Sequence, residues 1–137
     1  MDITNKIQDL INSQATVFLS SIDACGYPNT RAMLAPRLVE ETHIFYFHTN
    51  TSSMHVAQYQ SNGKACLYLC DPESFIGILL VGEIELAEDY KTMLWQEGDE
   101  LYYSKGIQDP DYCVLRFTAA SARLYQNFSS HTYSLGS

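Results

Sequence analysis

The octapeptide HTNTSSMH, at residues 48–55, holds the side chains whose types and spacing best suit an anion. Small polar residues end an aromatic, strand-like run here and precede a helix-like pattern, so hydroxyl groups and free backbone N–H groups converge. The positive end of a helix dipole favours a phosphate at such a place. Thr49, Ser52 and Ser53 can each add an O–H donor. A plain helix cap needs only one of them, and this simpler interpretation stays open.

Two other places carry side chains suited to a ligand. Arg31 and Met33 share one face of a predicted strand, with Ala32 on the opposite face. Arg31 could bind a phosphate or a carbonyl group through paired hydrogen bonds, although an exposed strand arginine is the simpler interpretation. Trp95, the only tryptophan, is followed by two tyrosines and could cover a planar ring or pack in a core or an interface.

The sequence offers little to a metal ion or a catalytic nucleophile. The four histidines, at 43, 48, 55 and 131, show no ligand spacing with one another or with cysteine. Motifs of the types G-x-S-x-G, G-x-G-x-x-G and G-x-x-x-x-G-K are absent. The four cysteines form no C-x-x-C pair, and we expect free thiols. We therefore predict no metal site, no hydrolase and no particular catalytic residue.

Charge and hydropathy exclude further classes of protein. The net charge is −8 and the eight Lys and Arg residues are scattered, so no positive stripe for nucleic acid is expected. The longest apolar run, Ile76–Val81, is far too short to span a membrane, and the first ten residues do not resemble a signal peptide. We expect a cytoplasmic protein without a nucleic-acid or membrane partner.

The elements that must position these residues form one predicted domain, 1–137. Short strands with turn signals between them favour an antiparallel barrel or sandwich. The apolar face of the last strand changes phase across Ala119-Ala120, which indicates a β-bulge. Pro36 implies a bulge or an edge position. The expected helices are 3–14, capped by Thr4 or Asn5, then 52–61 and 89–101, with Asp89 as cap, and the six expected strands are 15–22, 30–39, 44–48, 64–70, 75–87 and 112–128.

Taken in order, four segments resemble the FMN-binding split-barrel family that includes pyridoxamine 5′-phosphate oxidase, in its short general-stress-protein-like branch. They are ATVFLSSIDACGYPNTRAM (15–33), IFYFHTNTSSMH (44–55), GEIELAEDYKTMLW (82–95) and GIQDPDYCVLRF (106–117). The resemblance implies a mainly β fold, a six-stranded antiparallel split β-barrel. It also implies a homodimer that holds FMN in a groove between its subunits. The implied flavin contacts are Arg31, Ala32 and Met33 along the ring and ribityl chain, Thr49, Ser52 and Ser53 at the phosphate, and Trp95 from the other subunit.

His55 departs from the family pattern, which usually has Lys two residues after the phosphate-binding serine. Lysine is a permanent charge near neutral pH, whereas histidine is mostly neutral unless a neighbouring anion raises its pKa. A phosphate group could do this, so we expect FMN binding here to be weaker or more dependent on pH than is usual in the family.

The function that these features favour is an FMN-dependent oxidoreductase with an unidentified small-molecule substrate. The short chain and the lack of a strong basic surface argue against pyridoxamine phosphate itself. Two alternatives remain. One is a non-catalytic flavin-binding dimer. The other is a haem-handling protein with His48, His55 or His131 as axial ligand, against which the missing basic patch for propionates argues.

Overall fold

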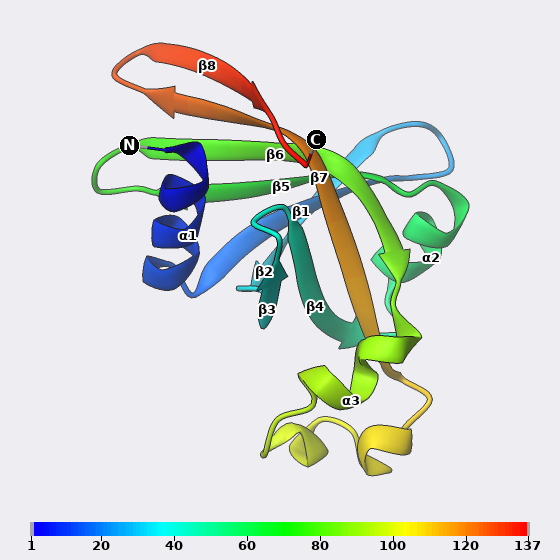
Figure 1. Ribbon diagram of the computed structural model, residues 1–137. Helices are drawn as coiled ribbons and strands as arrows, with labels where there is room; N and C mark the ends of the chain where they lie inside the picture. Colours follow the sequence, from blue (N-terminus) through cyan, green and yellow to red (C-terminus); the bar gives the residue numbers. More distant parts are fainter. Residues whose placement is uncertain (1, 137) are drawn as a thin grey trace.

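The computed structural model describes residues 2–136 and shows one antiparallel sheet with short helices in its connections (Figure 1). The strand order is β2-β1-β5-β6-β7-β4-β3, with β8 paired to β7. The strands are β1 (Thr16–Ile22), β2 (Pro28–Leu34), β3 (Leu38–Glu40), β4 (Ile44–Asn50), β5 (Lys64–Asp71), β6 (Ile76–Leu86), β7 (Tyr112–Gln126) and β8 (Ser129–Ser134). The helices are α1 (Ile3–Ser13), α2 (Met54–Ser61) and α3 (Lys91–Leu94), with 3₁₀ turns at Glu88–Tyr90, Asp99–Leu101 and Gly106–Gln108.

The curled sheet encloses the main core. Side chains from alternate positions of β1, β4, β5, β6 and β7 meet there, and α1 covers one end with Ile7, Leu10 and Ile11. The α1 cap is Asp2, whose carboxylate accepts the Thr4 N–H, so the expected cap at Thr4 or Asn5 was wrong. A second cluster, which we call the tyrosine cluster, lies between β4, β7 and the α3 region; its buried members are Tyr46, Tyr103, Tyr112, Ala87, Leu94 and Val114, and Trp95 packs against them. In the described part of the chain, no helix combines the length and apolar character needed to cross a bilayer.

The predicted bulge in β7 is present. Val81 pairs with Ser121 and Gly82 with Ala119, so Ala120 is the extra residue on the β7 side. A Cβ on Gly82 would lie 2.0 Å from the Thr118 carbonyl oxygen, so only glycine lets the two strands approach there. The bulge returns Ala122 and Leu124 to the buried face after Ala119.

The expected single strand 30–39 was wrong, because the chain leaves the sheet at Ala35-Pro36-Arg37. Proline has no N–H to give to a ladder, and the chain bends there from β2 at one end of the sheet to β3 at the other. The count of six strands also missed β8. It pairs with β7 through a turn at Asn127-Phe128, and both of these residues have positive φ without being glycine.

The expected helix 89–101 is also wrong in length and cap, because only Lys91–Leu94 is α-helical and Asp89 lies within the preceding 3₁₀ turn. Trp95 is extended and Gly98 adopts φ 101°, which ends the helix. The Asp99 carboxylate accepts the nearby Gln96 N–H and binds the distant Arg37, so side-chain bonds replace the helical ones.

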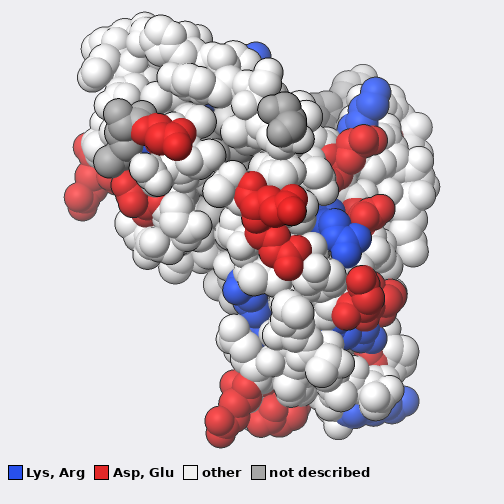
Figure 2. Space-filling view, viewed as in Figure 1, with Lys and Arg blue, Asp and Glu red and all other residues white. Residues whose placement is uncertain are grey.

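Charged side chains are spread over the molecule. In the view of Figure 2, Asp and Glu side chains form several separate patches on a mostly uncharged surface, with fewer Lys and Arg side chains near them. Several of these lie in pairs, such as Arg116 with Glu85 at 2.7 Å.

Candidate functional site

The sheet does not close on itself, and a cavity lies where its two ends face each other. Residues 31–35, in and just after β2, line one side, and residues 47–50 of β4 line the other. Its volume is about 630 Å³. We call this cavity the split. Its walls are strand edges, which leave backbone N–H and C=O groups unpaired, so it suits a ligand with hydrogen-bonding groups along a flat edge.

At one end of the split, Arg31, which the resemblance places along the ring and ribityl chain, meets Thr49, Ser53 and His55 of the expected phosphate segment. Arg31 Nη1 lies 2.6 Å from His55 Nδ1, and His55 Nε2 lies 3.1 Å from Thr49 Oγ1. Ser53 Oγ is 3.5 Å from the same Nε2 atom. Residues from β2, β4 and α2 thus form one network, which we call the Arg31–His55 cluster.

Hydrogen-bond chemistry decides where the His55 proton lies. Arginine can only donate, so Nδ1 of His55 must accept, and the neutral ring carries its proton on Nε2. That proton points to Thr49 Oγ1, which leaves the Thr49 O–H free to donate to a ligand. The Ser53 O–H is committed to the Asn50 carbonyl oxygen at 2.7 Å.

His55 is neutral at physiological pH in this structure. Its side chain is buried, and this burial, together with the Arg31 guanidinium, lowers its pKa to about 4. The positive charge of the cluster therefore comes from Arg31 alone, with His55 holding that guanidinium in place through an uncharged acceptor.

The start of α2 has free donors and one competitor. Ser53 makes no side-chain cap, and the N–H groups of Met54 and His55 have no partner among residues 2–136. The Ser52 N–H instead donates to the Asp111 carboxylate at 2.7 Å. Ser52 lines none of the cavities described here, and Asp111 places a negative charge beside it. The structure therefore brings Thr49 and Ser53 to the cluster but leaves Ser52 outside it.

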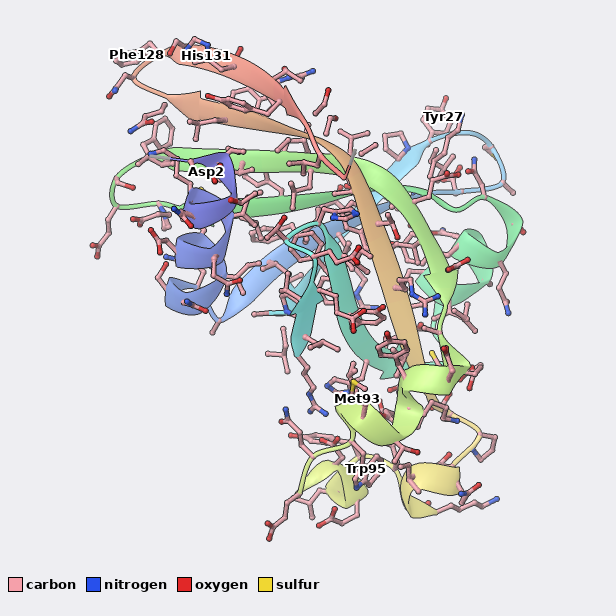
Figure 3. The ribbon with its side chains drawn as sticks, in the orientation of Figure 1. Asp2, Tyr27, Met93, Trp95, Phe128 and His131 are labelled. Carbon is pink, nitrogen blue, oxygen red and sulfur yellow. The ribbon has the colours of Figure 1, made fainter. Side chains whose placement is uncertain are left out.

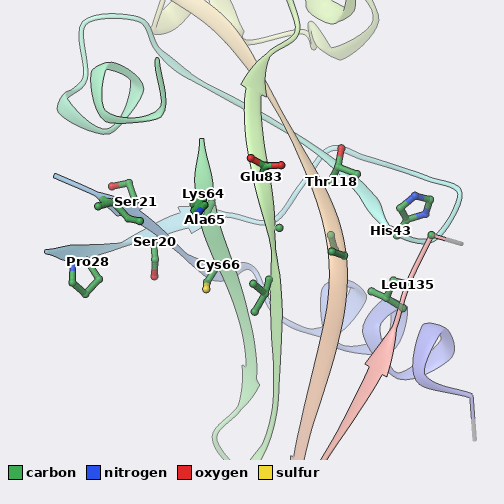
Figure 4. Close-up of a pocket in the computed structure, with 16 residues that line it drawn as sticks. Ser20, Ser21, Pro28, His43, Lys64, Ala65, Cys66, Glu83, Thr118 and Leu135 are labelled. Carbon is green, nitrogen blue, oxygen red and sulfur yellow. The ribbon is translucent and has the colours of Figure 1, made fainter. Parts of the chain in front are cut away.

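Two further cavities lie near the cluster. A small one of about 180 Å³ lies between β2 and α2 and shares Arg31 with the split. Its neighbour, of about 660 Å³, shares Ser21 with it and lies on the sheet face formed by β1, β5, β6 and β7 (Figure 4). Small or apolar side chains line much of that face, among them Cys66, Val81 and Ala120. A ligand at Arg31 would therefore lie at the border of this open face.

Trp95 lies away from the cluster, beside α3 (Figure 3). Its ring packs edge-on against Tyr112, with centroids 5.0 Å apart, and against Tyr103 at 6.1 Å. Within this chain it belongs to the tyrosine cluster and lines none of the three cavities.

The split also holds polar residues that the sequence analysis did not select for this site. His48 Nδ1 lies 3.4 Å from the Tyr103 hydroxyl, which donates to Asn50 Oδ1 at 3.2 Å. Arg37, also at the split, forms a two-point ion pair with buried Asp99 at 2.6 and 2.9 Å. The Asp109-Pro110-Asp111 turn, already part of the resemblance, was the one sequence signal for Asp111.

The chemistry open to this site is anion binding at Arg31 and hydrogen bonding along the split. No group of three His, Cys, Asp or Glu side chains is placed to hold a metal ion within the described residues. The four cysteines are free, as expected.

Comparison with known proteins agrees with this geometry. The family model described as pyridoxamine 5′-phosphate oxidase matches residues 3–126. The chain belongs to this family, whose fold is the split barrel seen here.

Among solved structures, one is a Clostridium acetobutylicum protein related to general stress protein 26 of the pyridoxinephosphate oxidase family. It is 36% identical, with a TM-score of 0.85, over 98% of this chain and 96% of that one. No match was found among curated proteins.

Two more distant structures share the fold. One is a pyridoxamine 5′-phosphate oxidase-related, FMN-binding protein from Nostoc punctiforme, 14% identical with a TM-score of 0.72, covering 97% of this chain and 96% of that one. The other is a haem-binding protein from Mycobacterium smegmatis, also 14% identical with a TM-score of 0.72, covering 98% of this chain and 58% of that one. The fold alone therefore does not select the ligand.

Proposed function

We propose that this chain is an FMN-binding flavoprotein whose phosphate site is the Arg31–His55 cluster. The observation that carries the proposal is the set of donors around Arg31, namely its guanidinium and a free Thr49 O–H at the split and the two uncapped N–H groups of α2 at the small cavity that shares Arg31. A phosphate group binds to donors of these kinds. The edges of the two strands along the split would form hydrogen bonds with a flat ring. Ala32 and Met33, which line the split, would contact the flavin.

The donor set fits a phosphate with one departure. Ser52 gives its N–H to Asp111, and that carboxylate would repel a nearby dianion. Phosphate would therefore lie on the Arg31 side of the loop, towards Thr49 and Met54, rather than at Ser52.

The proposal includes a homodimer, in which a second copy covers the sheet face of Figure 4. Val81 and Phe18, both on strands of this sheet, are each 39% exposed. Apolar side chains covered by a protein surface would be less exposed than this. Because the cavity on this face shares Ser21 with the small cavity that Arg31 and His55 line, a partner there would also lie close to the bound flavin. Trp95, which lies apart from the cluster in its own chain, would approach flavin only from the partner subunit.

The reaction class we infer is FMN-dependent oxidation or reduction of a small molecule. Bound FMN would supply the hydride and electron chemistry, while the protein supplies orientation and shielding from water. Of the three histidines considered for haem, His55 has both ring nitrogens bonded and His131 lies exposed on β8, so His48 is the one that could serve as an axial ligand at this site.

The test is titration of the purified protein with FMN, followed by flavin absorbance and fluorescence and by the melting temperature. We expect saturable binding and a higher melting temperature. Arg31→Gln removes the charged donor, whose hydrogen bond contributes about 1.5–3 kcal/mol, so binding should weaken about 10- to 150-fold. Arg123→Gln, an exposed arginine on β7 remote from the cavities, is the matched control and should leave binding unchanged.

Two results would refute the proposal. One is a protein that gains neither flavin bands nor thermal stability with FMN. The other is equal loss of binding in the Arg31 and Arg123 variants. A Soret band on haem titration, lost in a His48→Ala variant, would favour the haem alternative instead.

A further inference from the structure

His48, Tyr103 and Asn50 form a hydrogen-bonded chain on the β4 side of the split. Tyr103 is 2% exposed and is held among Trp95 and Tyr112, so its hydroxyl has a fixed position. That hydroxyl has one proton, which it gives to the Asn50 carbonyl oxygen at 3.2 Å. All three residues line the same cavity as Ala32 and Met33.

The hydrogen bonds among these three residues determine which ring nitrogen of His48 carries the proton. Since the Tyr103 proton is already given to Asn50, the contact of 3.4 Å between His48 Nδ1 and the Tyr103 oxygen requires Nδ1 to donate. The neutral His48 ring therefore carries its proton on Nδ1, and Nε2 has a free lone pair. Nε2 forms no hydrogen bond with residues 2–136.

The free Nε2 atom belongs to a side chain that lines the cavity. No side-chain nitrogen or oxygen in the described chain is both buried and without a partner, so an unbonded Nε2 must be accessible. Burial of the ring and the nearby Arg37 charge lower the pKa of His48, against a smaller opposing effect of Asp99. His48 thus stays neutral, and able to accept a proton, near pH 7.

We propose that His48 Nε2 is the proton acceptor of the split and receives a hydrogen bond, then a proton, from an alcohol or amine group of the substrate. This inference rests on the proposed flavin site and adds a proton acceptor to it. Oxidised flavin, when bound, would take up the hydride as the substrate C–H bond breaks. The substrate O–H or N–H proton passes to Nε2, a C=O or C=N bond forms, and the imidazolium then releases the proton to water. Tyr103 and Asn50 are positioning residues that keep Nε2 free.

The first test is the proton position on each histidine, measured through the ¹⁵N chemical shifts of the ring nitrogens at pH 7.5. We expect His48 to carry its proton on Nδ1 and His55 on Nε2. Tyr103→Phe keeps the packed ring and removes only the hydroxyl, so it should shift His48 towards the other tautomer. Tyr112→Phe, which removes a neighbouring buried hydroxyl bonded to the Lys91 carbonyl, should not. A protonated Nε2 on His48 in the unaltered protein would overturn the proposal.

The second test is modification by diethyl pyrocarbonate, which attacks accessible, unprotonated imidazole nitrogens, with mass spectrometry to assign each site. At pH 6 we expect His48 to react while His55, bonded at both nitrogens, does not. Saturating FMN should slow the reaction at His48 at least tenfold and leave exposed His131 unchanged. An unreactive His48, or one that reacts equally fast with FMN bound, overturns this inference while the flavin titration still stands. A protein that does not bind FMN overturns the proposed function itself, and the titration shows this separately.

Discussion

The His55→Gln variant measures how much the lowered pKa of His55, the buried histidine beside Arg31, contributes to the pH dependence of stability. Glutamine can accept from Arg31 and donate to Thr49, as the neutral ring does, but it cannot take up a proton. The variant therefore keeps the hydrogen-bonding pattern and removes only the titration. Any change in how stability varies with pH reports the shifted pKa of His55.

The size of the effect follows from that shift. The pKa of His55 falls from an ordinary 6.5 to about 4 in the folded chain, so the unfolded chain binds a proton that the folded chain does not between these pH values. At about 1.4 kcal/mol for each pH unit, His55 costs the wild type about 3 kcal/mol of folding free energy as pH falls from 6.5 to 4. The cost is absent above about pH 6.5, where His55 is neutral in both states, and it grows as pH falls towards 4.

Urea unfolding, followed by Trp95 fluorescence at several values between pH 8 and pH 4, measures the effect. We expect the stability gap between wild type and His55→Gln to be constant from pH 8 to 7 and then to change by about 3 kcal/mol in favour of the variant by pH 4. The His131→Gln variant, altered at an exposed site, controls for general charge effects. A gap between wild type and His55→Gln that stays constant down to pH 4 would show that His55 titrates normally and is not buried against Arg31.

Three further substitutions test the fold and the proposed dimer. Asp99→Asn leaves Arg37 without its buried counter-charge and should cost about 3 kcal/mol in urea unfolding, whereas exposed Glu97→Gln should cost almost nothing. Gly82→Ala places a Cβ 2.0 Å from the Thr118 carbonyl oxygen, so the bulge must open, and we expect a loss of at least about 2 kcal/mol in the same assay. Val81→Glu puts a charge on the face proposed to meet a second copy and should halve the mass found by sedimentation. An unchanged mass would count against that face as the dimer interface.

The sequence predicted the features that depend on local pattern. Alternation in 112–128 located β7 and its bulge, because a change of phase is visible in the order of residues. The loss of β-pattern after His48 located the start of α2 within one residue of Ser53.

Features that depend on distant residues were missed. Nothing near Arg37 in the chain indicates that it binds Asp99, 62 positions away, and this pair is what helps to end the helix that propensity would continue. The tautomer of His48 likewise depends on Tyr103, 55 positions away, and follows only from three-dimensional contact. β8 was missed because its turn uses Asn127-Phe128 rather than the usual glycine.

The site also bears on whether His55 can replace the lysine of the family pattern as a charge. To be half-protonated at pH 7, His55 would need its pKa raised by about 3 units from about 4, a change of about 4 kcal/mol. A charge-assisted hydrogen bond to phosphate contributes about 1.5–3 kcal/mol, which is too little. We therefore predict that His55 remains neutral with FMN bound and that Arg31 alone carries the charge. The dissociation constant of FMN should then change less than twofold between pH 7 and 8.5 in fluorescence titrations. A tenfold weakening over that range, absent in His55→Gln, would show instead that phosphate does protonate His55.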